Sequence, residues 1–385
     1  MGIRGSCRVK VDVFIIGGGI VGLACAAESA KRGFSTLLVE RHESFGQETS
    51  SRNSEVIHSG IYYPTGFLKA RLCVAGNQNL YKECDKTNVW YNRCGKLIVA
   101  VVPEEEESLH NLYERGIANG IEGLQILDGK QANKLEPYVK CCSAIYVPGT
   151  GIIDSHELMK SYFLEAKANG ADTAFGVEYI GCENRNESYS LHMKDTNGDD
   201  VRLDARHVIN AAGLRSDKVA QSFGIDIDAA DYRLHHNRGH YYTVSPTKSR
   251  LISHLVYPLP HQHLVSVGIH MTIDKSGQMK LGPDMGYLDP SIPEADWYKF
   301  DDSRKEKFYN AVHRYFPSLE LEDLSPGQVG VRPKLKGSEE TIKDFIIKEE
   351  SDRGLPGLVN LIGIESPGLT CAREIAREVF KILHQ

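Results

Sequence analysis

The chain has 385 residues, of which 41% are hydrophobic and 25% charged, and its formal net charge is -6. This length exceeds a single ordinary hydrophobic core and predicts two domains, and the composition is typical of a soluble globular protein. The basic residues are scattered and the overall charge is acidic, so we expect no nucleic-acid partner. The nine cysteines lack paired C-x-x-C spacing, which indicates mostly free thiols and no metal site.

The hydrophobic runs of the chain are too short or too interrupted for a membrane-spanning helix. The longest run covers residues 13–27 and contains four glycines. We therefore expect no integral membrane segment, while peripheral contact with a membrane stays open. The start of the chain carries Arg4, Arg8 and Lys10 and no acidic residue up to residue 10. This basic start is either a frayed terminus or the remnant of a mitochondrial presequence, and these residues by themselves favour neither.

A glycine-rich turn near the start predicts a nucleotide-binding unit. Residues 11–16 form a predicted buried strand, and Gly17, Gly19 and Gly22 follow with the spacing G-x-G-x-x-G before an apolar helix. Such glycines permit the tight turn, let the backbone approach a pyrophosphate, and allow the helix to pack on the strand. A second apolar strand ends at Glu40, whose carboxylate can accept ribose hydroxyl groups. Together these elements favour a dinucleotide site over a purely structural turn.

The remaining hydrophobic patterns alternate between helical and strand periods. We expect helices over residues 67–86, 104–119, 154–169, 303–315 and 369–383. We expect strands over residues 95–101, 207–210, 232–244, 255–259 and 264–271, and a three-stranded meander over 174–203. Pieces of the nucleotide-binding unit therefore occur at both ends and in the middle of the chain, which predicts two interleaved domains.

Three separated segments carry a resemblance to a known superfamily. They are the glycine turn, residues 208–213 (Val-Ile-Asn-Ala-Ala-Gly) and residues 363–370 (Gly-Ile-Glu-Ser-Pro-Gly-Leu-Thr). Together they resemble the FAD-dependent oxidoreductases of the D-amino-acid oxidase superfamily. The resemblance implies that the second segment lies near the cofactor and that the third directs backbone N–H groups toward the flavin. No second G-x-G-x-x-G is present for a nicotinamide, so electrons should come from a bound substrate, and FAD is preferred to NAD.

Further segments narrow the resemblance to one branch of this superfamily. They are residues 52–63, 68–73, 95–97, 238–242, 268–272 and 330–334. With them, nearly the whole chain from Asp12 onward looks like the L-2-hydroxyglutarate dehydrogenase branch. The chain departs from that pattern at His240, where many relatives carry an acid, and at Gly66-Phe67.

The resemblance implies an α/β fold, in which a Rossmann-like FAD-binding domain is interleaved with an α+β substrate domain built on a mixed sheet. We expect the discontinuous FAD-binding domain to comprise residues 11–85, 145–228 and 325–385. The substrate domain would then comprise residues 86–144 and 229–324.

The resemblance also implies an activity, the FAD-dependent oxidation of (S)-2-hydroxyglutarate to 2-oxoglutarate, with electrons passed to an unidentified acceptor. One alternative is an enzyme of the same fold that acts on an amino acid, an N-methyl amine or glycerol 3-phosphate. Another is a flavin-binding module without turnover. Relatives in eukaryotes are typically mitochondrial, which favours a mitochondrial location for this chain, and a cytoplasmic location is the alternative.

The cofactor contacts are expected from the glycine turn, the acidic strand end, the hydroxyl-rich loop 46–54 and the two later segments. The expected residues are Gly17, Gly19, Gly22, Glu40, Arg41, Thr49, Ser50, Asn53, Ser54, Val177, Ala212, Gly213, Ser366, Pro367, Gly368, Leu369 and Thr370. The start of the last helix can also stabilise negative charge on a flavin ring.

Oxidation of a 2-hydroxy acid requires loss of the hydroxyl proton and transfer of the α-hydrogen as hydride to flavin N5. A neutral imidazole suits the first step. The resemblance places His58 and His270 beside the flavin, and we assign His270 as the base and His58 as a flavin or substrate contact. The alternative is that each histidine only donates or accepts a structural hydrogen bond.

A dicarboxylate substrate requires cations, and a guanidinium group can bind a carboxylate with two hydrogen bonds. We expect Arg238 and Arg332 in this role, with Lys69 as a further candidate. The alternative is that Arg332 contacts the flavin and Arg238 pairs with an acid inside the sheet. Tyr241, Tyr257 and Tyr62 could supply hydroxyl donors and an apolar wall, and packing in the core is the alternative for these tyrosines.

Overall fold

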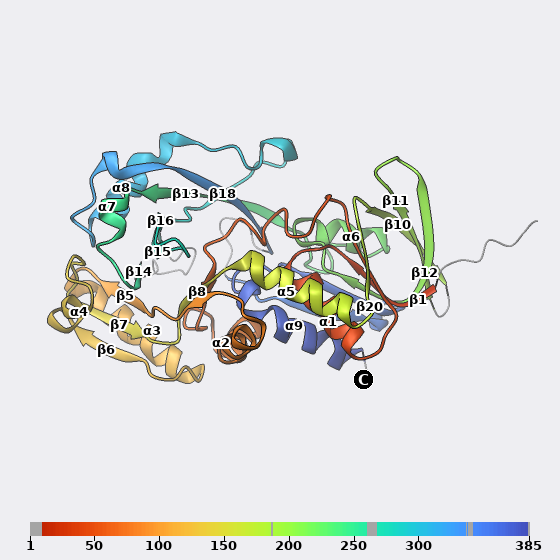
Figure 1. The fold of residues 1–385 in the computed structure, drawn as a ribbon, viewed down its shortest axis with the longest axis horizontal. Helices are drawn as coiled ribbons and strands as arrows, with labels where there is room; N and C mark the ends of the chain where they lie inside the picture. The colour runs from red at the N-terminus through yellow and green to blue at the C-terminus, as the bar shows by residue number, and fades with distance from the viewer. Residues whose placement is uncertain (1–9, 186–187, 260–267, 336, 338–341, 384–385) are drawn as a thin grey trace, which may run out of the picture.

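The structure, a computed structural model, describes residues 10–185, 188–259, 268–335, 337 and 342–383. Figure 1 shows two lobes lying side by side along the longest axis. One lobe contains the first strand, β1 (Lys10–Ile16), together with the last helix, α9 (Gly368–Ile382). Segments from the two ends of the chain therefore share one lobe, as interleaved domains require.

The first sheet is built around β1, which pairs in parallel with β2 (Thr36–Glu40) and β12 (Asp200–Asn210). Its other strands are β9 (Asp172–Phe175), β10 (Glu178–Arg185), β11 (Ser188–Lys194), β19 (Ile346–Glu350) and β20 (Leu355–Ile362). The strand order is β10-β11-β12-β1-β2-β9, and β20 pairs with β12 and with β19. A parallel centre followed by crossover helices is the Rossmann-like arrangement.

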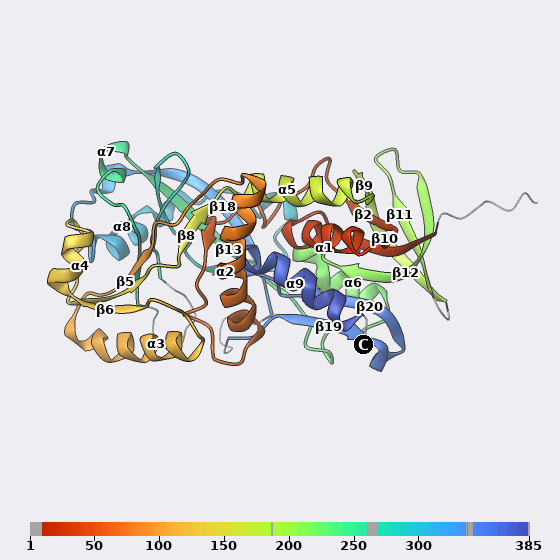
Figure 2. The ribbon, with the colours of Figure 1, turned by 60° about the horizontal axis from the view of Figure 1, so that its bottom comes forward.

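Both faces of β1 are buried, which explains why its sequence is continuously apolar rather than alternating. Val13 and Ile15 belong to the core under the helices on one face, whereas Phe14 and Ile16 belong to a second core on the other face. Helices α1 (Ile20–Lys31), α5 (Ser155–Ala168) and α9 cover the first face, and Figure 2 shows them side by side. Helix α6 (Ser216–Ser222) packs on the second face. The sheet therefore lies between layers and presents only its strand ends to a ligand.

The second sheet is mixed and runs β17-β13-β16-β15-β14-β5-β7-β6, with β18 paired to β13. Its strands are β5 (Lys96–Ala100), β6 (Gln125–Asp128), β7 (Ser143–Val147), β13 (His235–Val244), β14 (Leu255–Pro258), β15 (Met271–Ile273), β16 (Met279–Leu281), β17 (Gly286–Tyr287) and β18 (Leu324–Lys334). The helices of this lobe are α3 (Glu106–Ala118), α4 (Gly129–Leu135), α7 (Pro246–Ser249) and α8 (Lys305–His313). Between the lobes lie α2 (Leu68–Thr87) and a small sheet of β3 (Val56–Ile57), β8 (Gly151–Ile153) and β4 (Tyr91–Asn92).

The expected fold class is confirmed, because a Rossmann-like parallel sheet and a separate mixed sheet alternate along the chain. The expected domain division differs from the sheet pairing at two places. The boundary at 145 cuts through β7, which pairs with β5 and β6. The boundary at 325 would give β18 to the first domain, but β18 pairs along β13 in the second sheet. Strand pairing is a long-range property, so hydrophobic pattern alone did not assign these strands to a sheet.

One expected helix agrees closely with the observed one, and two other expected segments lie partly outside the described residues. The predicted helix 154–169 is α5, and the Asp154 side chain accepts a hydrogen bond from the Glu157 backbone N–H at 2.9 Å. Half of the predicted strand 264–271, residues 264–267, lies outside the described residues, and β15 begins at Met271. Residues 1–9 of the basic start also lie outside them, and Lys10 is the first residue of β1.

Two further features bear on the expectations from composition. Each cysteine within the described residues is a free thiol, and Cys7 lies outside them. Within the same residues, no helix has the length and apolar character needed to cross a membrane.

Candidate active site and cofactor cradle

Two adjoining cavities lie at the carboxyl ends of the parallel strands. The larger has a volume of ≈ 270 Å³ and the smaller ≈ 130 Å³, and Gly19, Thr49, Ser50, Ala211 and Gly213 line both. The larger also receives residues from β13 and β18 of the second sheet. Ligands of open α/β sheets bind at this edge of the strands. The two cavities together form one elongated site, and its wider end lies between the two sheets.

The glycine turn forms a cradle that side chains would fill. Gly17 has φ +108°, and a Cβ atom there would lie 2.5 Å from the carbonyl oxygen of Ala211. A Cβ atom on Gly22 would lie 2.0 Å from the carbonyl oxygen of Gly17, so Gly22 serves the packing of α1 and does not line either cavity. Helix α1 starts at Ile20, whose backbone N–H donates to Ser50 Oγ at 3.0 Å. A helix start beneath glycines fits a pyrophosphate group.

The smaller cavity has an acidic residue where a ribose would lie. One carboxylate oxygen of Glu40 accepts the Gly18 backbone N–H at 2.7 Å, and the other accepts the His42 N–H at 2.9 Å. These bonds hold the carboxylate in place, with lone pairs left for hydroxyl donors. The other expected residues that line this cavity are Gly17, Gly19, Arg41, Thr49, Ser50, Val177, Ala212 and Gly213.

The charge of Arg41 is already paired in the structure. Its guanidinium group lies 2.8 Å from Glu48, which also pairs with Arg215 at 2.8 Å. Burial acts to raise the pKa of Glu48, but the charges of Arg215 and Arg41 and a hydrogen bond from His42 hold it below its usual value. Arg41 therefore fixes the wall of the smaller cavity through Glu48 and lines it with its side chain.

The segment before α9 lies against the larger cavity. Ser366, Pro367, Gly368 and Leu369 line it, as expected. Thr370 does not, and its Oγ1 instead accepts the His58 backbone N–H at 3.0 Å. We expected Thr370 to contact the cofactor directly. In the structure its side chain instead fixes the loop that carries His58, because it lies where α9 packs against that loop.

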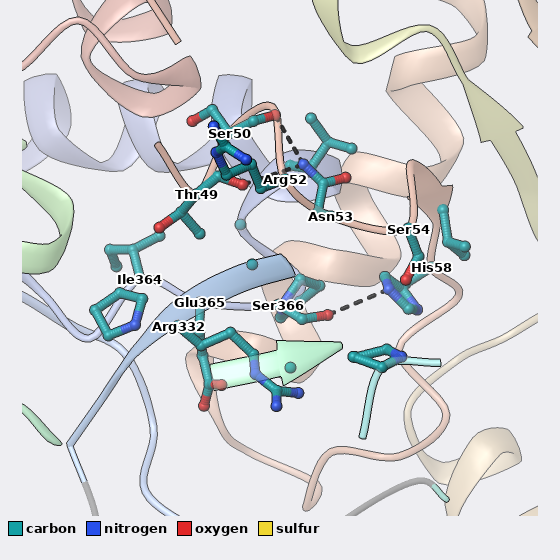
Figure 3. Close-up of a pocket in the computed structure, with 18 of the residues that line it drawn as sticks. Thr49, Ser50, Arg52, Asn53, Ser54, His58, Arg332, Ile364, Glu365 and Ser366 are labelled. Carbon is teal, nitrogen blue, oxygen red and sulfur yellow. Dashed lines mark hydrogen bonds between the residues drawn. The ribbon is translucent and has the colours of Figure 1, made fainter. Parts of the chain in front are cut away.

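The loop after the glycine turn also lines the larger cavity. Asn53 donates to the backbone oxygen of Ser50 at 2.7 Å, and this bond braces the loop from within. The hydroxyl of Ser54 lies 3.0 Å from that of Tyr241 on β13, so the loop is joined to the second sheet. Figure 3 shows Thr49, Ser50, Asn53 and Ser54 along one side of the cavity.

Both candidate histidines line the larger cavity, and His270 is buried whereas His58 is half-buried. His58 lies with Nε2 3.2 Å from Ser366 Oγ, and Figure 3 shows the two side chains pointing toward one another. The His270 ring stacks on Tyr257 with centroids 3.8 Å apart, and its Nδ1 lies 3.2 Å from the carbonyl oxygen of Gly268. A carbonyl only accepts, so Nδ1 of His270 carries the proton and Nε2 is left as the acceptor.

The surroundings keep both imidazoles neutral. Burial lowers the pKa of His58 to about 3, and the charge of Lys96 acts in the same direction. Burial also lowers the pKa of His270 to about 3, against a raising effect of its hydrogen bond to Gly268. A neutral imidazole near pH 7 can accept a proton, and a nearby anion would stabilise the protonated form.

Four cationic side chains, Arg52, Lys69, Arg332 and Lys334, and two acidic ones, Glu55 and Glu365, line the same cavity. Arg332 on β18 donates to Asn237 Oδ1 and to the carbonyl oxygen of Asp284, and its buried Nε has no partner within the described residues. Lys69 and Lys334 lie 3.1 Å and 2.9 Å from the two oxygens of Glu365. Burial acts to raise the pKa of Glu365, but the two lysines lower it to about 2. The cavity therefore has a net positive charge.

Arg238 is the one expected substrate residue that the fold places elsewhere. It lies on β13 between Asn237 and Gly239 and lines neither cavity. Side chains alternate across a strand, so Arg238 is directed to the face opposite Asn237, which contacts Arg332. His240 shares the face of Arg238, is fully buried, and lies with Nδ1 3.2 Å from Asp284. Of the two expected arginines, Arg332 lines the cavity and Arg238 does not.

The cavity also contains residues without an assigned role in the sequence analysis. They are Arg52, Glu55, Lys334 and Glu365, and Lys96 lies directly behind the tyrosines of its wall. One signal was present, since Lys96 is a charged residue inside the otherwise apolar strand β5. No group of three or more histidine, cysteine or acidic side chains is placed to hold a metal ion in the described part of the chain.

Comparison with known proteins relates this site to a family. Residues 12–382 match the family described as FAD dependent oxidoreductase (DAO). The chain is 36% identical to the mitochondrial L-2-hydroxyglutarate dehydrogenase of Arabidopsis thaliana, over 97% of this chain and 83% of that protein. It is 31% identical to the human protein of the same name, over 94% of this chain and 85% of the other. A bacterial L-2-hydroxyglutarate dehydrogenase, from Indibacter alkaliphilus, is 29% identical over 96% of this chain and 97% of its own.

Solved structures agree with this relationship. L-alpha-glycerophosphate oxidase from Mycoplasma pneumoniae, with FAD bound, superimposes with a TM-score of 0.85 and 27% identity, over 98% of this chain and 95% of that one. Glycine oxidase from Geobacillus kaustophilus has the same fold, with a TM-score of 0.80 at 18% identity over 98% and 95% of the chains. The chain thus belongs to the DAO family of FAD-dependent oxidoreductases and resembles the L-2-hydroxyglutarate dehydrogenases within it.

Proposed function

We propose that this protein oxidises (S)-2-hydroxyglutarate to 2-oxoglutarate. The observation that carries the proposal is the larger cavity, in which two neutral histidines face a net positive set of side chains. Neutral bases beside cations suit an anionic alcohol that must lose its hydroxyl proton. The identity of 29–36% to proteins named L-2-hydroxyglutarate dehydrogenase supports this choice among 2-hydroxy acids.

The cofactor residues have separate roles in this proposal. The start of α1 and the glycine turn would hold the pyrophosphate, and Glu40 would accept the ribose hydroxyls. Ser366, Pro367, Gly368 and Leu369 would support the flavin end with the N-terminus of α9. FAD, when bound, supplies the acceptor for the two electrons that the alcohol loses with its α-hydrogen.

The protein's own groups would bind and deprotonate the substrate. Arg332 would bind the carboxylate next to the alcohol, because its Nε is buried without a partner within the described residues and its Nη2 is held by Asn237 and Asp284. Nε2 of His270 would accept the hydroxyl proton, since Nδ1 is committed to Gly268. The bound carboxylates would stabilise the resulting imidazolium. His58 and Tyr241 would contact the substrate, and Lys69 would act with Lys334 through Glu365.

An anaerobic titration of the purified holoprotein tests the proposal. The flavin absorption band should bleach with (S)-2-hydroxyglutarate and persist with the R enantiomer and with glycerol 3-phosphate. Replacement His270→Asn should slow flavin reduction by about 10²- to 10⁴-fold, the range for loss of a general base. Bleaching by glycerol 3-phosphate instead would favour a function like that of the glycerophosphate oxidase that shares the fold. A flavin that none of the three compounds bleaches would disprove the substrate assignment.

We also propose a mitochondrial location, with electrons passed to an acceptor still to be identified. The support is that the plant and animal relatives are named as mitochondrial, whereas the bacterial relative is not. The full chain fused at its C-terminus to a fluorescent protein should co-localise with a mitochondrial marker, and a diffuse cytoplasmic signal would contradict this.

A further inference from the structure

Lys96 is a buried cation for which the described residues contain no anionic partner. It begins β5, its side chain has 0% exposure, and its Nζ makes no hydrogen bond within the described residues. The ammonium group lies 4.6 Å from the ring centroid of Tyr62 and 4.6 Å from that of Tyr257. The two rings are nearly parallel, with an interplanar angle of 16° and centroids 6.3 Å apart. Lys96 thus supports a pair of tyrosines from two different segments.

This placement is unfavourable for stability on its own. A buried charge without a counter-ion is destabilising, and attraction to the faces of Tyr62 and Tyr257 offsets only part of that cost. Burial accordingly lowers the pKa of the Lys96 ammonium group to about 7. The neighbouring positions on β5, Leu97 and Ile98, are buried and apolar, so an apolar side chain at position 96 would suit the packing better. The charge therefore points to an anion that the protein chain does not itself supply.

The two tyrosines connect Lys96 to the larger cavity. Tyr62 and Tyr257 both line it, and both hydroxyl groups are buried without a partner within the described residues. The charge of Lys96 also acts to lower the pKa values of His58 and His270, which line the same cavity. Two hydroxyl donors backed by a cation make a site for a carboxylate.

The carboxylate site at the tyrosines is separate from the one assigned to Arg332. Arg332 comes from β18 and is held by Asn237 and by the backbone of Asp284, whereas the tyrosines are held from β5. Lys69 and Lys334 already share the Glu365 carboxylate, so their charges are partly satisfied within the protein. The cavity thus offers two cationic sites from different elements, and a ligand with two carboxylates complements both.

We propose that Lys96 is a positioning residue that gives the cavity its preference for a dicarboxylate. Tyr62 and Tyr257, supported by the Lys96 charge, bind the second carboxylate of the ligand, while Arg332 binds the carboxylate beside the alcohol. Lys96 acts through the tyrosines and does not itself touch the substrate. This inference rests on the proposed function, and it adds the group that distinguishes a five-carbon dicarboxylate from a monocarboxylate of the same length.

Calorimetric titration of the holoprotein with 2-oxoglutarate and with 2-oxopentanoate tests the inference, since the second ligand lacks only the distal carboxylate. Lys96→Met should weaken 2-oxoglutarate binding by about 10- to 30-fold, the order for a unit charge acting across one side chain at an effective dielectric constant near 20. It should leave 2-oxopentanoate binding within about threefold. The flavin content should be unchanged, and the unfolding temperature should stay the same or rise because a buried charge is removed.

Two sets of variants separate this role from packing. Tyr62→Phe with Tyr257→Phe keeps the rings beside the ammonium and removes the hydroxyls, so it should reduce the same preference and should not add to the effect of Lys96→Met. Lys280→Met, in the same sheet but paired with Asp274 at 3.1 Å, is the control and should not change either affinity.

The outcomes distinguish the two levels of the proposal. If the wild-type protein binds 2-oxoglutarate and is reduced by (S)-2-hydroxyglutarate, but Lys96→Met binds both oxo acids as the wild type does, only the role of Lys96 is disproved. Equal loss of both ligands in Lys96→Met would indicate packing and would also disprove it. If the wild type neither binds nor is reduced, the proposed function and this inference are both wrong. If Lys96→Met does not fold, an unchanged preference in the tyrosine double variant overturns the inference.

Discussion

The two ends of the proposed cofactor and substrate site are built in different ways. At the phosphate end, a few consecutive residues, Gly17 to Gly22, with Glu40 at the end of the next strand, form the cradle largely from backbone atoms. At the substrate end, the side chains come from segments far apart in sequence, among them His58, His270 and Arg332. The first end depends on local backbone conformation, and the second depends on how the two sheets are paired and placed.

This difference indicates what each end tolerates. A backbone cradle fails when a side chain is added, because its groups are fixed by the turn itself. In a site made of side chains, replacement of one side chain removes one function and leaves the others, since each group is held by its own strand or loop. Replacements at the glycine turn, at Arg332 and at the two histidines examine the difference, in order of decreasing effect.

Gly22→Ala should have the largest effect. The added Cβ atom would lie 2.0 Å from the Gly17 carbonyl oxygen, so α1 cannot pack against the turn. We expect a fall of about 3 kcal/mol or more in the free energy of unfolding and loss of bound flavin, checked by denaturation and by the absorption spectrum. Gly181→Ala, where nothing lies within 4 Å of the new Cβ atom, is the control and should retain flavin. A flavin-loaded, stable Gly22→Ala protein would show that the cradle is not built as described.

Arg332→Met should leave the phosphate end intact and damage the substrate end. The flavin should remain bound, while kcat/KM for (S)-2-hydroxyglutarate falls by about 10²- to 10³-fold, which corresponds to about 3–4 kcal/mol for a buried charged contact. Steady-state assays with an artificial electron acceptor measure this change. Arg238→Met is the matched control on the paired strand, and we expect less than about a threefold change, because Arg238 lines neither cavity. A larger effect for Arg238→Met than for Arg332→Met would reverse the assignment.

His58 and His270 should add a smaller, pH-dependent contribution to stability. Their pKa values are lowered to about 3 in the folded protein, so between pH 6.5 and pH 3 the unfolded chain takes up protons that the folded protein does not. The free energy of unfolding should therefore fall as the pH decreases through this range, by about 1–2 kcal/mol per histidine between pH 7 and pH 5.

Chemical denaturation of His58→Asn and His270→Asn at pH 5, 6 and 7 measures this contribution. Each variant should show a shallower decline than the wild type, whereas His110→Asn, at an exposed position on α3, should show the same decline. Parallel curves for all four proteins would mean that the two histidines are protonated in the folded state as readily as in the unfolded chain.

Most residues that the sequence assigns to the phosphate end line the smaller cavity together, because the signals for that end are local. The spacing of Gly17, Gly19 and Gly22 depends on one turn, and the structure gives the backbone reason for two of the three glycines. The fold class followed from the alternation of strand and helix patterns, and it is confirmed. The expected boundaries inside β7 and β18 differed from the observed pairing, because hydrophobic period does not state which strand is the neighbour.

At the substrate end, the sequence indicated which types of residue to expect, but it did not indicate which side chains would lie next to one another. Arg238 and Arg332 are equivalent by composition, yet antiparallel pairing of β13 with β18 brings only Arg332 beside Asn237 and the cavity. Lys96 lies in an otherwise apolar strand, so the sequence did not indicate a role for it. A role for its charge is indicated only by the tertiary structure, which brings Tyr62 and Tyr257 beside the ammonium group.

The sequence by itself determined the family, the nucleotide-binding turn and the alternation that produces two sheets, because each rests on short-range backbone chemistry and on hydrophobic period. Only the tertiary structure decided which charged and hydroxyl groups meet in the cavity. The physical reason is that a strand turns successive side chains to opposite faces, so the register and neighbour of a strand, set by contacts distant in sequence, select the side chains that face the ligand.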